Sequence, residues 1–474
     1  MKSLSIIIPV SIAMPLAMGL ATGCAVSDSA GEVTSTAATR SPDPLLPGLG
    51  NDGYDARAYD LNFDVGAKSR TVDGTATMTA QAHKPLARFG MDFAGGTVHS
   101  VSVDARPARF QAKGQKLVVV PARGLDRGLF RVTVRYTADR DAKVPSTVDP
   151  SAGWGDTGGG GFAWWGQPDR AHLFFPCNDD LTDKAIFRYR VTVPNGWTAI
   201  ANGTQTSRSI KADRTTMVYS SQHPMATQLA QLAVGRFKIV QGQGPHGLPL
   251  RSAVPAGSTI ANLQRLPEYL TWLENKIGRR YPFEAAGVLG VSGSPPEQTF
   301  ALETQTLPIF TASDLSDSQE IVHELAHQWF GDSAGVKTWS DLWLSEGFAS
   351  YLDQMWAAEH GGTPLDTAMR KAYQGDQKIR SMGITPARPR RADAMFGVSR
   401  GVGPLVLYAL RQKVGDAGFQ QIVGTYFDRY RDRSASTADF MAVAHRVAGP
   451  QMDDFLHDWL YESKTPPMPG HPDW

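Results

Sequence analysis

The spacing of apolar residues changes near residue 258, and this change limits the folds open to the chain. From about residue 53 to 245, short runs such as "TVDGTATMTAQA" and "LFRVTVRYTA" are separated by Gly, Asn and Asp, a pattern that predicts antiparallel strands. From Ser258, a candidate helix cap, leucines recur at helical spacing. Further helical patterns cover 317–331, 340–360, 403–415, 417–430 and 437–447. We therefore expect a β-rich half followed by a mostly helical half.

Length and composition indicate a globular protein of more than one domain. The chain has 474 residues, more than an average domain, so two or three domains are expected. Hydrophobic residues make up 42% and charged residues 20%, which is ordinary for a globular chain. The 47 basic and 46 acidic residues give a formal net charge of +1. This balance gives no support to nucleic acid or an anionic surface as a partner.

The first 24 residues, "MKSLSIIIPVSIAMPLAMGLATGC", predict export. Lys2 precedes an apolar run and then small residues, as in a secretory signal peptide over residues 1–23. Pro9 and Pro15 interrupt the run and argue against a spanning helix. The ending "LATGC" resembles the lipobox of bacterial lipoproteins, which implies lipid attachment to Cys24. We therefore expect a cell-surface or periplasmic lipoprotein that contacts the membrane only through Cys24; cleavage elsewhere would leave it secreted.

Two stretches lack any periodicity. Residues 24–52 are rich in Ser, Thr, Ala, Pro and Gly, which predicts a disordered tether. The segment 151–166, "SAGWGDTGGGGFAWWG", is expected to form a surface loop rather than a regular element.

The stretch "IVHELAHQWF" (321–330) predicts two metal ligands on one helix, with Asp317 or Ser318 as its cap. His323 and His327 share a helix face, with about 5–6 Å between their Cβ atoms, so both can bind one zinc ion. Glu324 lies one position round, where a carboxylate suits a base acting on water. The alternative is a chance pattern on an ordinary helix, because a catalytic zinc site needs a third protein ligand.

The segment 339–362, "WSDLWLSEGFASYLDQMWAAEHGG", supplies that third ligand. Ser340 is a candidate cap for its helix. Leu344, Phe348, Tyr351 and Leu352 mark its buried stripe, and Glu346 lies near Leu342 and Ala349 in helical projection, facing the same interior. A carboxylate on an apolar face is costly unless it is paired, and a zinc ion would pair it; the alternative is a half-exposed glutamate. One Zn²⁺ bound by three side chains is therefore expected.

The sequence motifs around these candidate ligands resemble those of a known family. "HELAHQWFGD" followed by "WSDLWLSEGFASYL" is similar to the M1 aminopeptidases, which are gluzincin metallopeptidases. "HLFFPCNDDLTDKAIFRYRVTVPNGWTAIANG" (172–203) resembles the family's N-terminal domain, and "FALETQTLPIF" (300–310) its substrate-anchoring strand. The resemblance implies an antiparallel β-rich N-terminal domain (53–245), a thermolysin-like, mostly helical zinc metallopeptidase domain (246–465) and a tail (466–474).

The resemblance also assigns roles to single residues. It implies His323, His327 and Glu346 as zinc ligands and Glu324 as general base. Glu303 falls on the glutamate that binds the free α-amine of a peptide, although the rest of that anchoring motif differs here. Gln167 falls on a glutamine that contacts the same N-terminal residue; the alternative is a loop glutamine that contacts nothing. Ser345 stands where the family usually has Asn, and we expect no chemical consequence.

One residue of the family pattern is missing. The family places a tyrosine, which stabilises the oxyanion, just before a helix that corresponds here to "GPLVLYALR". That position falls at or near Arg400, whose guanidinium is a capable charge stabiliser. Tyr408 is the other candidate, but its leucine neighbours indicate a core position.

The implied function is a zinc aminopeptidase, a monomer that acts on peptides with a free N-terminus. The alternative is a zinc-containing peptide-binding protein with weak or no turnover, suggested by the missing tyrosine. An intact Glu324 argues against the alternative, because a protein that only binds peptides does not need a base there.

Overall fold

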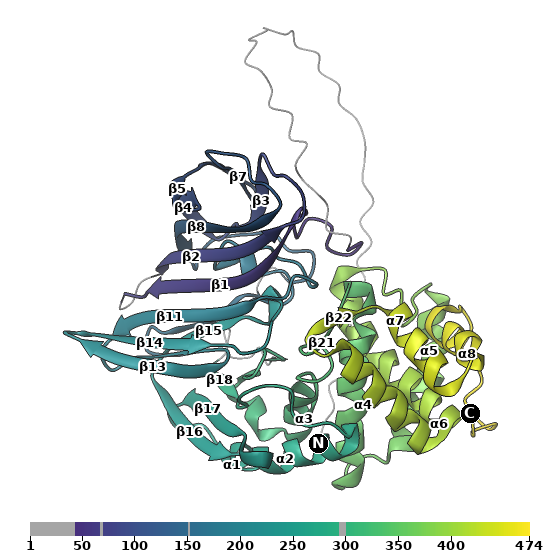
Figure 1. Cartoon of the computed structure of the whole chain (residues 1–474). Helices are drawn as coiled ribbons and strands as arrows, with labels where there is room; N and C mark the ends of the chain where they lie inside the picture. The colour runs from purple at the N-terminus through teal and green to yellow at the C-terminus, as the bar shows by residue number, and fades with distance from the viewer. Residues whose placement is uncertain (1–42, 67–69, 150–151, 293–299) are drawn as a thin grey trace, which may run out of the picture. The chain divides into compact units, whose positions relative to one another are not determined.

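The first half of the chain is built on an eight-stranded sheet with the order β13-β14-β11-β1-β2-β8-β4-β5 (Figure 1). The computed structural model describes residues 43–66, 70–149, 152–292 and 300–474. The strands of this sheet are β1 (Tyr54–Asp64), β2 (Thr71–Ala82), β4 (Gly96–Val103), β5 (Arg106–Pro107), β8 (Gly128–Asp139), β11 (Ile186–Pro194), β13 (Thr204–Lys211) and β14 (Arg214–Ser220).

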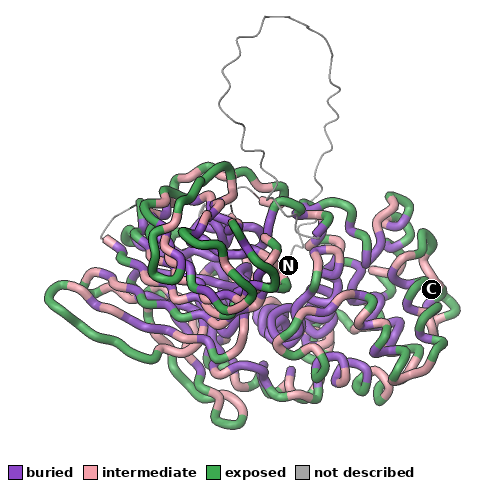
Figure 2. Tube along the Cα trace, turned by 45° about the horizontal axis from the view of Figure 1, so that its top comes forward, coloured by how far each residue is buried: buried purple, intermediate pink, exposed green. Residues whose placement is uncertain are grey.

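Strand β1 shows why these sequences form a sheet with one buried face. Its residues alternate between buried and less buried, with Tyr59, Leu61 and Phe63 on the buried side, as in a sheet that packs on one face. Figure 2 shows buried residues in the interior of the fold and exposed residues on its outer loops. Leu61 lies opposite Ala76 of the antiparallel strand β2 and opposite Tyr189 of the parallel strand β11. The other pairs of this sheet are antiparallel, as expected. The β1–β11 pair differs because the chain builds further strands before returning beside β1, and parallel pairs need such a long connection.

Two smaller sheets complete the first half. One has the order β12-β15-β10-β9 and the other β3-β7-β6. Their strands are β12 (Thr198–Ala201), β15 (Gln231–Gly235), β10 (Phe162–Trp165), β9 (Trp154–Asp156), β3 (Phe89–Asp92), β7 (Lys116–Val120) and β6 (Arg109–Lys113).

The prediction of a surface loop at 151–166 is wrong, because strands β9 and β10 both lie in this segment. All four residues of β10 are buried. A Cβ atom added to Gly155 would lie 2.9 Å from the ring of Trp165. Gly155 therefore allows close packing of the indole, and the glycine-rich composition hides two strands.

The second half contains a five-stranded sheet with the order β16-β17-β18-β20-β19, followed by helices (Figure 1). The strands are β16 (Phe237–Gln243), β17 (Pro249–Pro255), β18 (Leu289–Val291), β20 (Ile309–Thr311) and β19 (Ala301–Leu302). The antiparallel hairpin β16–β17 spans residues 245 and 246, so this sheet begins at Phe237. The helices are α1 (Ala261–Gln264), α2 (Leu266–Ile277), α3 (Ser318–Ala326), α4 (Trp343–Glu359), α5 (Leu365–Ser381), α6 (Met395–Tyr430), α7 (Thr437–Ala448) and α8 (Gln451–Tyr461), and β21 (Ala334–Val336) pairs with β22 (Arg433–Ala435).

Most of the predicted helices are present. Helices α3, α4 and α7 occupy the expected positions, and α6 is interrupted at Gly415 (φ 74°, ψ 170°), between the two patterns expected at 403–430. Helices α5 and α8 were not predicted. Helix α5 buries only Met369, Asp376 and Arg380, although Leu365, Ala368, Met369, Ala372 and Tyr373 recur at helical spacing. Among the described residues, no helix has both the length and the apolar character to cross a membrane.

The predicted caps agree with the structure only in part. The Asp317 carboxylate accepts hydrogen bonds from the backbone N–H groups of Gln319 and Glu320, which confirms it as the cap of α3. Ser258 and Ser340 are not caps: α1 begins at Ala261, and a capping box of Thr338 and Asp341 precedes α4. Thr338 and Asp341 satisfy each other's hydrogen-bonding groups, so Ser340, two residues after Thr338, is not needed as a cap.

The prediction of a tether over 24–52 is wrong for residues 43–52, which pack against the fold. Leu46 and Leu49 are buried with Trp339, Leu342, Ala392 and Met395 in one cluster. Asp43 accepts hydrogen bonds from the backbone N–H groups of Leu45 and Trp339. The rest of the tether, the signal peptide and Cys24 lie outside the described residues.

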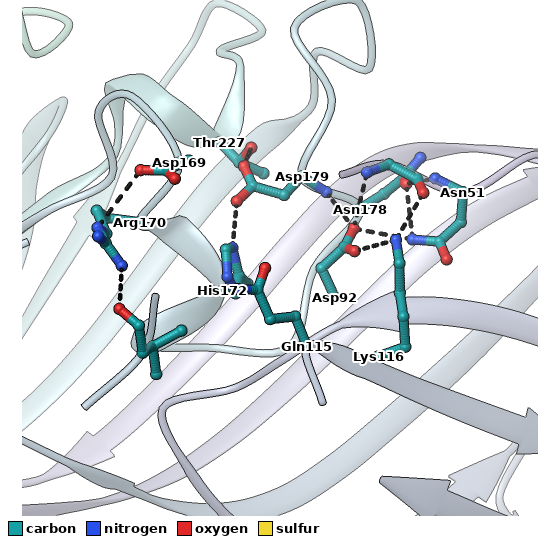
Figure 3. A network of polar contacts seen from close by, with 12 residues as sticks. Asn51, Asp92, Gln115, Lys116, Asp169, Arg170, His172, Asn178, Asp179 and Thr227 are labelled. Atoms are coloured by element: carbon teal, nitrogen blue, oxygen red, sulfur yellow. Dashed lines mark hydrogen bonds and ion pairs between the residues drawn. The ribbon is translucent and has the colours of Figure 1, made fainter. Parts of the chain in front are cut away.

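A buried polar network fixes the backbone that follows β10 (Figure 3). Asp92 pairs with Lys116 and accepts a hydrogen bond from the backbone N–H of Asp179 at 3.0 Å. The Asp179 carboxylate in turn accepts from His172 Nδ1 and from Thr227 Oγ1, each at 2.7 Å. Buried charges that are paired and hydrogen-bonded in this way hold their segments in one arrangement.

Helices α4 and α6 cross at two glycines, and this crossing positions part of the site described below. A Cβ atom added to Gly403 would lie 2.6 Å from the Cα atom of Gly347, a distance too short for a van der Waals contact between the two helices.

We expect Gly403→Ala to lower the free energy of unfolding by about 1–3 kcal/mol through overpacking. Gly401→Ala on the same helix is the matched control, because nothing lies within 4 Å of its added Cβ. Thermal or denaturant unfolding measures both; an equal stability of the two variants would contradict the close crossing.

Candidate active site

Helix α3 brings the two histidines together in the interior. Its apolar residues Ile321, Val322, Leu325 and Ala326 are buried in the main core of the second half, which fixes the rotation of the helix. His323 and His327 are each 1% exposed, and their Nε2 atoms are 3.1 Å apart. The two ring nitrogens therefore face a common point, as the spacing predicted.

Helix α4 places Glu346 at that same point. Glu346 is buried, on the apolar face as expected. Its Oε2 atom lies 3.4 Å from His323 Nε2 and 3.8 Å from His327 Nε2. The three atoms form a group that could hold a metal ion.

The geometry of this group fits a tetrahedral metal ion such as zinc. Tetrahedral ligands at zinc distances of about 2.0–2.1 Å lie about 3.3–3.4 Å from one another, and the three separations here are 3.1, 3.4 and 3.8 Å. Glu346 Oε2 is buried and has no hydrogen-bond partner among the described residues. A buried carboxylate oxygen without a partner is costly, and a cation at this point would satisfy it.

The outer nitrogens of both histidines are held by other side chains. His323 Nδ1 lies 2.8 Å from Asp353 Oδ2, and His327 Nδ1 lies 3.0 Å from Ser345 Oγ. If each Nδ1–H donates to these oxygens, the Nε2 lone pairs are left free for a metal. The Ser345 hydroxyl thus contacts His327 and also donates a hydrogen bond to the Phe330 carbonyl at 3.2 Å; whether asparagine at this position would act differently stays a prediction.

Glu324 lies beside the metal ligands and has an unused oxygen. Its side chain is 2% exposed, and Oε2 has no hydrogen-bond partner among the described residues. Burial raises the pKa of Glu324 well above its ordinary value; among the nearby charges, His323 and Arg400 lower it and Glu303 raises it. A buried carboxylate with a raised pKa is suited to taking up and returning a proton.

Glu303 and Gln167 meet although 136 positions separate them in the sequence. Gln167 follows β10 and Glu303 follows β19, and Gln167 Nε2 donates a hydrogen bond to Glu303 Oε1 at 2.6 Å. Both side chains are buried. An oxygen of Glu303, an oxygen of Glu324 and a ring nitrogen of His327 all lie within 4.8 Å of one another. Gln167 thus contacts another site residue, and the pair lies directly beside the metal ligands.

One cavity of about 260 Å³ joins these residues. It is lined by Gln167, Glu303, His323, Glu324, Glu346 and Arg400, together with aromatic rings and aliphatic side chains. The aromatic members are Trp154, Trp165, Phe300 and Phe396. A largely apolar cleft with a few converging polar groups is the usual form of a ligand site.

The structure distinguishes between Arg400 and Tyr408, the two candidates for the role of the missing tyrosine. Arg400 lines the cavity, with Nε 3.9 Å from Glu346 Oε2. Tyr408 is 1% exposed, and its hydroxyl is hydrogen-bonded to Asp366 and His471 at 2.8 Å each. Tyr408 is not among the residues that line the cavity, in agreement with the core position that its neighbours indicated.

The sequence analysis did not identify Asp353, Glu320 or the aromatic wall of the cavity, which consists of Trp154, Trp165, Phe300 and Phe396. Asp353 lies two helical turns after Glu346 on α4, so its spacing was a usable signal for a second carboxylate on the same face. Glu320 binds Arg400 through two contacts of 3.1 Å, a pairing between α3 and α6 that no spacing reveals. The aromatic residues come from four separate segments.

The fold and the site together define a two-domain metallopeptidase. The model of the peptidase family M1 domain matches residues 262–459, and that of the M1 N-terminal domain matches residues 55–229. The chain therefore belongs to peptidase family M1.

Curated relatives of this family include aminopeptidases much longer than this chain. The glutamyl aminopeptidase of Bitis rhinoceros is 26% identical over 329 residues, covering 63% of this chain and 34% of the relative. The probable aminopeptidase 1 of Sulfurisphaera tokodaii is 25% identical over 412 residues, covering 81% and 49%. The chain thus spans about a third to a half of these relatives.

Solved structures include proteins of matching length. The M1 zinc metallopeptidase of Deinococcus radiodurans has a TM-score of 0.80 and 29% identity, and the match covers 91% of this chain and 99% of that one. A mutant of the same enzyme bound to a Tyr-Ser-Ala substrate gives a TM-score of 0.81, also at 29% identity, with 92% and 100% covered. Both domains of the present chain are therefore represented in one known two-domain enzyme.

The hydrogen bond between His323 and Asp353 provides a test of the metal centre. We expect Asp353→Ala to weaken zinc affinity about 10–100-fold, because outer partners orient the ligating histidine. Competition with a fluorescent zinc chelator measures the change. Glu359→Ala, near the end of the same helix and bound to Trp272 and Lys276, is the control and should keep the affinity of the unchanged protein. Equal affinity of Asp353→Ala and the control would contradict the assignment.

Proposed function

We propose that this protein is a zinc-dependent aminopeptidase that removes single N-terminal residues from peptides. The observation that carries the proposal is the Glu303–Gln167 pair, a buried carboxylate and amide beside the candidate metal ligands. A bound Zn²⁺ lowers the pKa of a water molecule and polarises a carbonyl group. His323, His327 and Glu346 would hold it.

The Glu303–Gln167 pair supplies what a protonated α-amine needs. The amine carries a positive charge and N–H donors, and Glu303 offers a buried negative charge. Gln167 Oε1 is buried and has no hydrogen-bond partner among the described residues, so it is an acceptor ready for one of these N–H groups. Because the pair lies within a few ångströms of Glu324, only the first peptide bond of an anchored substrate reaches the base.

Glu324 acts first as the general base and then as the general acid of the proposed reaction. It takes a proton from water as the water oxygen bonds to the carbonyl carbon. It then gives that proton to the nitrogen as the C–N bond breaks, which releases the N-terminal residue and a shortened peptide. Its buried position and unused oxygen suit both transfers.

The aromatic wall suggests which N-terminal residues are preferred. The rings of Trp165 and Phe300 contact each other in a tilted arrangement, with their centroids 4.7 Å apart. Trp165 lies two positions before Gln167, and Phe300 lies three positions before Glu303. A panel of aminoacyl amides tests the function: we expect the highest kcat/KM for large apolar residues such as Leu and Phe, with complete inhibition by a chelator. Absence of release from all of them would instead support the alternative, a peptide-binding protein with weak or no turnover, and release that a chelator does not inhibit would contradict the zinc dependence.

The anchoring role of Glu303 has a direct kinetic test. We expect Glu303→Ala to lower kcat/KM at least about 30-fold, because truncating one partner of a buried charge pair costs about 2 kcal/mol or more. The loss should be smaller for an N-acetylated substrate, whose N-terminus has no charge to bind. Glu268→Ala, an exposed glutamate paired with Arg265, serves as the control. Equal losses for free and acetylated substrates would contradict amine binding.

We also propose that the protein is exported as a lipoprotein and acts as a monomer. The support is the N-terminal sequence that ends at Cys24 and the presence of all site residues on one chain. Intact mass spectrometry of the membrane-extracted protein tests the first point, since an unmodified Cys24 would contradict it. Light scattering of the purified protein tests the second.

A further inference from the structure

Arg400 is the feature of the cavity that the proposed function leaves unused. It lies near the start of α6, with Phe396 one turn before it, and both line the cavity. The glycine crossing of α4 and α6 explains its position. Arg400 is one turn before Gly403, and Glu346 directly precedes Gly347, so the close contact of the two glycines brings Arg400 to Glu346.

Glu320 holds the Arg400 guanidinium in place, and some of the guanidinium N–H groups remain free to donate hydrogen bonds. Arg400 Nη2 lies 3.1 Å from both carboxylate oxygens of Glu320, and Glu320 is one turn before Glu324 on α3. The Nε atom is 3.9 Å from Glu346 Oε2, too far for a hydrogen bond. Within the described residues, Nε and Nη1 therefore make no hydrogen bond, and 41% of the side chain is exposed.

Among the described residues that line the cavity, Arg400 is the one arginine or lysine, and the acidic ones include Asp149, Glu303, Glu324 and Glu346. When the water oxygen bonds to the carbonyl carbon, the π electrons of the C=O bond move to the carbonyl oxygen. This new negative charge forms beside the carboxylates of the cavity, and a donor already in position would stabilise it together with a bound Zn²⁺. A guanidinium is always protonated and offers several N–H groups in a fixed plane.

We infer that Arg400 is a catalytic residue that donates a hydrogen bond to the oxyanion of the scissile carbonyl, held in position by Glu320. The inference rests on the proposed function and assigns the charge-stabilising role to a residue type other than a phenol. The phenol of Tyr408 is already engaged with Asp366 and His471, outside the cavity.

Two other roles for Arg400 make different predictions. If it only compensated the charge of Glu346, its loss would alter zinc affinity. If it bound a carboxylate or another group of the unreacted substrate, its loss would raise KM and weaken binding of all ligands alike. A donor to the oxyanion changes neither, because the charge that it binds exists only after the water has added.

The test compares Arg400→Ala with Arg400→Lys, Glu320→Gln and the control Arg411→Ala, which removes an arginine of α6 outside this cavity. Arg400→Ala should lower kcat about 10²–10³-fold with zinc content unchanged. KM and the affinity for free L-leucine should stay within about threefold. The affinity for a phosphinic analogue of a leucyl dipeptide, which carries a tetrahedral anionic centre, should fall in parallel with kcat.

The variants and outcomes separate the roles. Arg400→Lys should recover part of the lost kcat because it restores the charge, and Glu320→Gln should cost less than Arg400→Ala because the guanidinium remains. An Arg400→Ala variant that keeps kcat and phosphinate affinity, loses zinc, or weakens leucine and phosphinate equally would overturn the inference. Absence of turnover in the unchanged, zinc-loaded protein would instead overturn the proposed function, and the inference with it.

Discussion

Glu324→Gln is expected to lower kcat by about 10²–10⁴-fold, the range that a positioned general acid–base contributes. The variant keeps the size of the side chain and removes its ability to accept a proton. Because the assigned ligands are His323, His327 and Glu346, and glutamine at 324 leaves all three in place, the zinc content should stay at one ion per chain. KM should change little, since we propose Glu303, and not Glu324, as the group that binds the amine.

Steady-state turnover of a leucyl amide, together with metal analysis, checks this expectation. Glu268→Gln on the exposed face of α2 is the matched control and should retain full turnover. A Glu324→Gln variant with kcat within about tenfold of the unchanged protein would show that the proton is moved by another group.

His327→Ala is expected to remove the metal and the activity together. Two ligands remain, and the buried oxygen of Glu346 loses the cation that satisfies it. We expect turnover to fall at least about 10³-fold, because the metal contributes several kcal/mol of charge stabilisation. Zinc raises the free energy of unfolding of a protein that binds it, by about 2.7 kcal/mol at a concentration 100 times Kd. His327→Ala should therefore lose the dependence of Tm on zinc.

Metal analysis and thermal unfolding in chelator and in zinc measure both effects. His457→Ala is the control, because His457 is 55% exposed and lies on α8, away from the cavity lining. Full zinc content in His327→Ala would contradict the ligand set.

The ligand-bearing helices were open to prediction because their signals are local. Helical spacing places His323, Glu324 and His327 together, an apolar face directs Glu346 inward, and Asp317 caps the first helix. Each of these inferences needs only residues within a few turns of one helix. The structure bears them out in the burial and convergence of the side chains.

The rest of the site depends on contacts between distant segments. The hydrogen bond from Gln167 to Glu303 and the ion pair of Arg400 with Glu320 span 136 and 80 positions, and no periodicity encodes them. The loop predicted at 151–166 was wrong for a related reason. Gly155 permits close packing of Trp165, but in a single sequence it cannot be told from a turn glycine.

Residues 43–52 illustrate the limit of compositional arguments. A stretch rich in Ser, Pro and Gly predicted disorder, yet Leu46 and Leu49 find an apolar cluster around Trp339 and Met395. Two leucines are enough to fix a short segment when a complementary surface already exists. Composition describes what a segment can bury alone and not what the rest of the fold offers it.

The most direct test of the aminopeptidase assignment is a time course of one unmodified peptide with the zinc-loaded protein, followed by mass spectrometry. Our account predicts a ladder of products, each shorter by one residue at the N-terminus. An N-acetylated copy of the peptide should be lost much more slowly, and a chelator should stop both reactions. Internal cleavage, or equal consumption of the free and acetylated peptides, would contradict the account.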